Sequence, residues 1–180
     1  MFPFRFDASP DELLGAIDHL HHASGVGMAA GVGVGRAAAG EGGDVAGGEQ
    51  DNEFSSWQLM IEHKSVDILK PDIMYLGGLH RTLEVCRMGA AAGLPITPHA
   101  ANLGLVTMCT MHLLRAIPNA GKYLEFSIEG PDYYPWQDGL FLGNPYDIAD
   151  GHATVTDAPG WGVEINPEWL EKAAYKVSEL

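Results

Sequence analysis

The chain has 180 residues, of which 46% are hydrophobic, and this is enough for one domain with a sizeable core. Acidic residues outnumber basic ones by 24 to 10, so the formal net charge is -14 at pH 7. Such a surface repels phosphate backbones and anionic membrane faces, which argues against nucleic acid or a membrane as partner. No apolar run reaches the roughly 18 residues of a membrane span, and the N-terminus lacks a signal-peptide pattern. We therefore expect a cytoplasmic protein.

The sequence divides into two parts of different character, residues 1–44 and residues 45–180. In the first part, Ser9 and Pro10 are typical of a helix start and predict a short helix over residues 10–20. Ten of the 24 residues from 25 to 48 are glycine, and few large apolar side chains accompany them. Because glycine at this density disfavours both helix and sheet, we expect residues 1–44 to form an irregular N-terminal segment.

Two motifs in the first part resemble binding sites but lack the necessary context. Residues 33–38 match a relaxed G-x-G-x-x-A dinucleotide fingerprint, which requires a preceding strand that this segment does not offer. His19, His21 and His22 suggest a metal cluster, but adjacent histidines on a helix point to different faces and no further ligand follows at a recognisable spacing. We therefore predict neither a nucleotide site nor a metal site there.

From residue 45 onward, segments with strand patterns alternate with segments of helical period. The predicted strands cover residues 45–49, 66–74, 94–99 and 123–127, and the predicted helices cover residues 53–64, 82–92 and 105–117. This alternation indicates parallel strands in an α/β barrel or an open sheet.

Each predicted strand carries a polar residue at or near its carboxyl end, and these residues are Glu49, Asp72, His99 and Glu125. They are separated by 23, 27 and 26 residues, and each interval is one β/α unit. In a barrel the four side chains would converge on the end where active sites are built. The alternative is that each acid caps a loop and that the histidine is a satisfied core residue.

Several motifs resemble the mandelate racemase/muconate lactonizing enzyme family of the enolase superfamily. Residues 70–78, Lys-Pro-Asp-Ile-Met-Tyr-Leu-Gly-Gly, resemble its P-D-x-x-x-x-G-G strand and turn, and Thr-Pro-His at 97–99 resembles the histidine half of its aspartate–histidine dyad. Gly-Gly-Glu at 47–49 is similar to its third metal ligand, and Tyr-Leu-Glu at 123–125 to its strand-eight glutamate. Residues 159–163 are similar to its P-G-x-G tail, so that the resemblance covers residues 45–180.

The resemblance implies a partial TIM-type (β/α)7β barrel, with this chain supplying its C-terminal half, strands five to eight, and the tail that returns to a capping domain. It implies Mg²⁺-assisted abstraction of the proton α to a carboxylate. Glu49 would be a metal ligand, His99 the catalytic base and Asp72 the residue that orients its ring. Glu125 would face the other carboxylate oxygen of the substrate and, if protonated, donate a hydrogen bond to it.

Other parts of that family's site have no counterpart in this sequence. The K-x-K lysine pair of strand two does not occur, and the glutamate motif of strand four is expected near residue 23, where no acid stands. One hypothesis is that residues 19–44 are read out of frame. Translating the other frames of the nucleotide sequence upstream of Glu49 tests it, because one of them should contain the acidic motif.

We expect the function to be dehydration of an acid sugar, since one dyad can remove the α-proton and then protonate the β-hydroxyl leaving group. Racemisation needs a second base on the opposite face. The alternative is a truncated, catalytically defunct remnant, or a half barrel that needs a complementary chain, for which a homo-oligomer is one route. A nucleotide-binding α/β domain is a third class. The expected partner is a small carboxylate such as an acid sugar.

Overall fold

The structure is a computed structural model and describes residues 44–100, 102–128, 132–135, 137–146, 148–174 and 176–177. The helix predicted over residues 10–20, the glycine-rich stretch up to residue 43 and the fingerprint at 33–38 lie outside the described residues. So do His19, His21 and His22.

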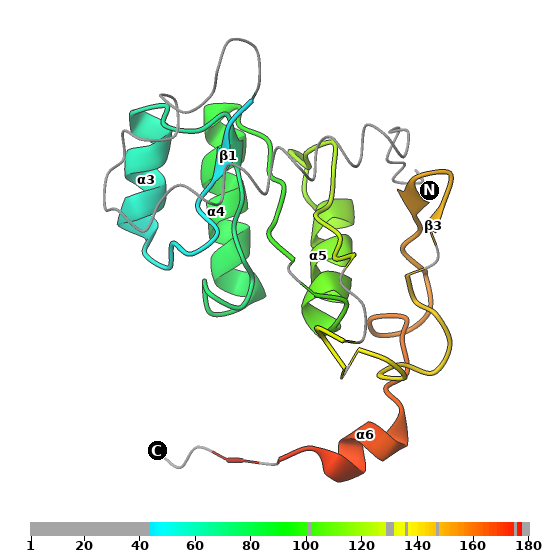
Figure 1. Cartoon of the computed structure of the whole chain (residues 1–180). Helices are drawn as coiled ribbons and strands as arrows, with labels where there is room; N and C mark the ends of the chain where they lie inside the picture. The colour runs from blue at the N-terminus through cyan, green and yellow to red at the C-terminus, as the bar shows by residue number, and fades with distance from the viewer. Residues whose placement is uncertain are drawn as a thin grey trace.

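Three helices follow the periodicity of the sequence. They are α3 (Phe54–Glu62), α4 (Leu79–Ala92) and α5 (Leu105–Ala116). Helices α3 and α4 pack side by side, with α5 beyond them (Figure 1). Gly93 ends α4 in the left-handed conformation with φ 73°, where a residue without a Cβ is favoured. Helix α4 begins three residues earlier than predicted, because Gly78 rather than a residue further along is its N-cap.

The strand segments pair in parallel and in sequence order. Strand β1 (Ala46–Gly47) pairs with β2 (Ile68–Leu69), with Ala46 opposite Ile68. Single parallel bridges continue the ladder from Leu69 to Ile96 and from Ile96 to Ala120. The α/β class with parallel strands is therefore confirmed. Among the described residues no pairing is recorded beyond β1 on one side or Ala120 on the other.

The strands are shorter than the sequence predicts. Only Ile68–Leu69 of the segment 66–74 forms a strand, and residues 94–99 form isolated bridges. Proline has no N–H to donate to a ladder, and Pro71, Pro95 and Pro98 interrupt these segments. The strand predicted over residues 123–127 is wrong, because the fourth pairing is made at Ala120 instead.

The C-terminal part forms a hairpin and a short helix. Strands β3 (Ile148–Ala149) and β4 (His152–Ala153) pair antiparallel. The two turn residues between them, Asp150 and Gly151, have φ 52° and 73°, as a two-residue hairpin turn requires. Helix α6 (Pro167–Lys172) begins with a proline at its first position. No helix in the described part of the chain is long and apolar enough to cross a membrane.

The core lies between the helices and the parallel segments. Its members share near-complete burial of large apolar side chains, including Trp57, Leu69, Leu76, Val85, Ile96, Met108 and Leu114. Burial of such side chains is the main source of stability in a domain, at roughly 25 cal/mol per Å² of apolar surface. The core therefore fixes the positions of the strand ends, where the candidate site lies.

Candidate active site

The four polar residues predicted from strand spacing lie together at the carboxyl ends of the parallel segments. Glu49 comes two residues after β1, and the bridge between Asp72 and His99 lies just beyond β2. The imidazole Nε2 of His99 lies 3.8 Å from Glu49 Oε2 and 3.9 Å from Glu125 Oε1. The arrangement therefore places one imidazole between two carboxylates, with a third carboxylate, Asp72, behind it.

Asp72 and His99 form a hydrogen-bonded dyad, with 2.7 Å between Asp72 Oδ2 and His99 Nδ1. Their main chains are neighbours too, since the two residues form a parallel bridge and the His99 N–H donates to the carbonyl of Pro71. The other carboxylate oxygen of Asp72 accepts from the backbone N–H groups of Met74 at 2.6 Å and Tyr75 at 3.0 Å. Asp72 is thereby fixed on both sides, and with Nδ1–H donating to it, His99 presents Nε2 as the proton acceptor.

The environment shifts the pKa values of both dyad members away from their ordinary values. Burial lowers the pKa of His99, but the hydrogen bond to Asp72 and the charges of Glu125 and Glu49 together outweigh it, so that the pKa is raised above 6.5. Burial raises the pKa of Asp72, but hydrogen bonds from His99, Tyr75 and Met74 outweigh it, and that pKa is lowered below 3.8. The dyad therefore favours a carboxylate beside a histidine of increased basicity.

A fifth residue, Lys70, lies at the centre of the site and was not predicted to belong to it. Its Nζ lies 2.9 Å from Glu125 Oε2 and 3.2 Å from Glu49 Oε2. The lysine side chain is 5% exposed, against 23% for Glu49 and 13% for Glu125. Glu125 Oε2 pairs with Lys70 and also accepts from the Ala100 N–H at 3.4 Å.

The sequence did contain a signal for Lys70. In extended chain, residues i and i+2 face the same side, and Lys70 stands two residues before Asp72 in an otherwise apolar stretch. A buried charge needs a partner of opposite sign, so a lysine in a buried strand already predicts a nearby carboxylate.

Gly48, the residue before Glu49, packs closely against Trp57. Gly48 has φ 105°, and a Cβ there would lie 2.4 Å from the ring of Trp57. Trp57 is fully buried and its indole N–H donates to the carbonyl of Asp51. Only glycine fits under this ring in this conformation, and the turn it makes directs the chain toward the site.

The described residues do not by themselves fit a divalent metal ion. Within this part of the chain, no group of three or more His, Cys, Asp or Glu side chains is arranged to hold one. Mg²⁺ takes about six oxygen ligands in octahedral geometry. Glu49 is the one expected metal ligand among them, and its Oε2 is in an ion pair with Lys70.

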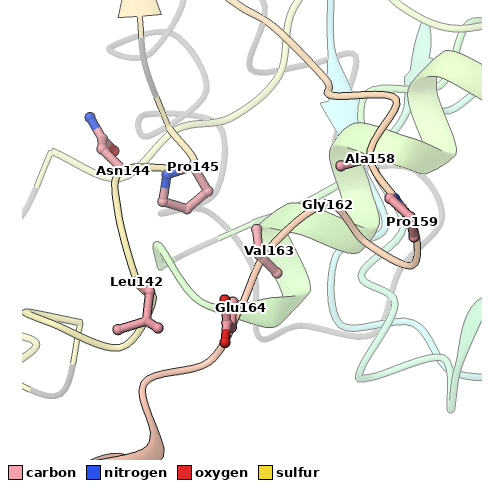
Figure 2. Close-up of a pocket in the computed structure, with 8 residues that line it drawn as sticks. All are labelled: Leu142, Asn144, Pro145, Ala158, Pro159, Gly162, Val163 and Glu164. Atoms are coloured by element: carbon pink, nitrogen blue, oxygen red, sulfur yellow. The ribbon is translucent and has the colours of Figure 1, made fainter.

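A hollow elsewhere on the molecule is separate from these residues. It has a volume of about 360 Å³ and is lined by residues of the C-terminal part, shown in Figure 2: Leu142, Asn144, Pro145, Ala158, Pro159, Gly162, Val163 and Glu164. Glu164 is its one charged lining residue. None of the five site residues lines this hollow, so it adds nothing to the chemistry of the dyad.

Comparison with known proteins identifies relatives of the same fold. The family described as "Enolase C-terminal domain-like" matches residues 33–169. A candidate racemase from Roseobacter denitrificans is 69% identical, with a TM-score of 0.72, over 76% of this chain and 37% of its own length. An enolase from Sargasso Sea environmental sequencing is 27% identical, with a TM-score of 0.61, over 74% of this chain and 34% of its own.

A more distant structure shares the fold. A candidate L-alanine-DL-glutamate epimerase from Burkholderia xenovorans strain LB400, bound to magnesium and fumarate, is 22% identical with a TM-score of 0.62, over 72% of this chain and 31% of its own. The chain thus spans about a third of the length of the solved structures that it matches.

Proposed function

Because the chain belongs to the enolase C-terminal domain-like family, within the mandelate racemase and enolase superfamily, we propose that it carries the general-base part of a site that removes the proton next to a substrate carboxylate. The observation that supports this proposal is the 2.7 Å contact between His99 Nδ1 and Asp72 Oδ2. With Nδ1–H held by Asp72, Nε2 would be the nitrogen that takes a proton, and Asp72 would stabilise the imidazolium that forms.

The finer proposal is dehydration of an acid sugar. His99 Nε2 takes the α-proton, and the same imidazolium then gives a proton to the β-hydroxyl group, which leaves as water. The resulting enol rearranges to a 2-keto acid. Glu125, which is ion-paired to Lys70, would contact the other carboxylate oxygen of the substrate. In this proposal His99 is the base and Asp72 orients its ring. Glu125 contacts the substrate, Glu49 is a metal ligand, and the protein is cytoplasmic.

The barrel architecture belongs to the proposal as well. We propose that the four parallel segments from β1 to Ala120 correspond to strands five to eight of a (β/α)7β barrel. Superfamily members bind Mg²⁺ and small carboxylates, and the B. xenovorans protein was crystallised with magnesium and fumarate. Since Glu49 is the one expected ligand among the described residues, the remaining ligands would come from beyond them.

A second candidate is a half site that acts only together with a complementary chain. The incomplete metal-ligand set and the absence of pairing beyond β1 in the described residues favour it. Positional looseness of about 1 Å can cost a hundredfold in rate, so the chain alone should turn over slowly.

The test is α-proton exchange in D₂O with a panel of acid sugars and Mg²⁺, followed by proton NMR. It is run with the chain alone and after co-expression with the part of the R. denitrificans protein that the match leaves uncovered. We expect exchange to rise on completion, to be abolished in His99→Asn and to be unchanged in His80→Asn, where the histidine is exposed on α4. Exchange that persists in His99→Asn would exclude His99 as the base.

Product analysis separates the reaction types. Formation of a 2-keto acid supports dehydration, whereas epimerised substrate without a keto acid supports the racemase description of the R. denitrificans neighbour.

A further inference from the structure

Lys70 pairs with two carboxylates, Glu125 and Glu49, through a single ammonium group. Its Nζ is 2.9 Å from Glu125 Oε2 and 3.2 Å from Glu49 Oε2. The whole Lys70 residue is 4% exposed, so its charge is shielded from water and depends on these two partners.

The charge of the site shows what the ammonium does. Glu49, Asp72 and Glu125 contribute three negative charges and Lys70 one positive charge, which leaves a net charge of -2 when His99 is neutral. Without Lys70 the net charge is -3, and only the neutral imidazole of His99 would lie near both Glu49 and Glu125. Like charges repel more strongly where the surroundings are only partly hydrated.

We propose that Lys70 is a positioning residue: its ammonium holds Glu49 and Glu125 in register and, by occupying Glu49 Oε2, excludes divalent cations from this part of the chain. A divalent cation that uses Glu49 Oε2 has to displace the ammonium from that oxygen. This proposal concerns the binding of a metal by the chain's own residues and does not depend on which carboxylate the site acts on.

The proposal makes a prediction that a purely structural role for Lys70 does not make. Lys70→Met removes the charge and keeps the apolar stem, and we expect the two carboxylates then to bind a divalent cation about tenfold more tightly, or better, than the unmodified chain. A lysine that served only to fill space would leave metal affinity unchanged on this substitution.

The experiment measures Mn²⁺ binding to the full chain by electron paramagnetic resonance of free Mn²⁺, with Mg²⁺ as competitor and no substrate present. Four proteins are compared: the unmodified chain, Lys70→Met, Lys70→Met combined with Glu49→Gln, and Lys122→Met. Lys122 is exposed and is therefore the matched control for loss of a lysine charge outside the site. Circular dichroism checks that each protein folds.

We expect tighter binding in Lys70→Met, loss of that gain in the double variant, and no gain in Lys122→Met. Equal affinity of the unmodified chain and Lys70→Met would overturn the proposal, as would an equal gain in Lys122→Met. If Lys70→Met is unfolded in metal-free buffer, millimolar Mn²⁺ should restore its fold, and failure to do so overturns the proposal as well. Because no substrate is used, the result is separate from the outcome of the proton-exchange experiment.

Discussion

Trp57 covers Gly48 so closely that a Cβ on Gly48 would lie 2.4 Å from one ring carbon and 2.6 Å from another. Gly48 immediately precedes Glu49, so this contact links the hydrophobic core to the first residue of the site. A fully buried indole cannot move aside without displacing its neighbours, because protein interiors are close-packed.

Gly48→Ala should therefore destabilise the protein by about 2–5 kcal/mol, from the positive φ and from the overlap with Trp57 together. Urea unfolding measures the change. Gly143→Ala is the matched control, because Gly143 has φ 82° but no atom within 4 Å of its Cβ position, and it should lose only about 1 kcal/mol from backbone strain. Equal losses in the two variants would show that Trp57 yields at little cost.

Asp72→Asn should change the tautomer of His99. The amide oxygen can still accept from the N–H groups of Met74 and Tyr75, but the amide nitrogen then faces His99 Nδ1 as a donor. We expect the proton to move from Nδ1 to Nε2, which would remove the base. Nitrogen-15 NMR of the imidazole distinguishes the two tautomers, and an unchanged spectrum would contradict the orienting role of Asp72.

The raised pKa of His99 predicts how its contribution to stability depends on pH. A group whose pKa is higher in the folded than in the unfolded state stabilises fully below its unfolded pKa of about 6.5, and that stabilisation is lost as the pH rises through the folded value. The free energy of unfolding of the unmodified chain minus that of His99→Asn should therefore be greatest at and below about pH 6 and decline above it. A difference that grows toward alkaline pH would show that burial outweighs the carboxylates.

Arg115 attaches the segment after β4 to helix α5. Its guanidinium donates to the carbonyls of Val155 and Thr156 and pairs with Asp157. Arg115→Met should increase the rate of limited proteolysis within residues 150–160, since three contacts are lost together. Asp157→Asn should change it little, because the Asp157 side chain is 55% exposed and exposed ion pairs contribute less than about 1 kcal/mol. Equal effects of both substitutions would mean that the ion pair, and not the carbonyl contacts, holds the segment.

The helices and the carboxyl ends of the strands were predictable because their signals are local. The apolar period identified α3 and α5 to within two residues at each end, and Gly93 marked the end of α4. The regular interval between Asp72 and His99 correctly placed them on neighbouring parallel segments. Strand extent was not predictable in the same way, because a ladder depends on the partner segment. Residues 123–127 have strand-like composition, but the chain pairs at Ala120 instead.

Lys70 was missed for a related reason. Its role follows from two carboxylates that lie 21 and 55 residues away in sequence, as 70 − 49 and 125 − 70, and from burial that composition alone does not reveal. A buried lysine in a strand segment therefore implies that a carboxylate lies close to it in the fold.

The parallel bridge between residues 72 and 99 has a consequence for the evolution and design of new activities. The main chains of these positions are joined by the N–H of His99 and the carbonyl of Pro71, so their proximity does not depend on which side chains they carry. A substitution at either position changes the reacting groups while the distance between the two Cα atoms is maintained. A library that randomises only positions 72 and 99 would therefore sample different pairs of acid, base and nucleophile at two main-chain positions that are held side by side.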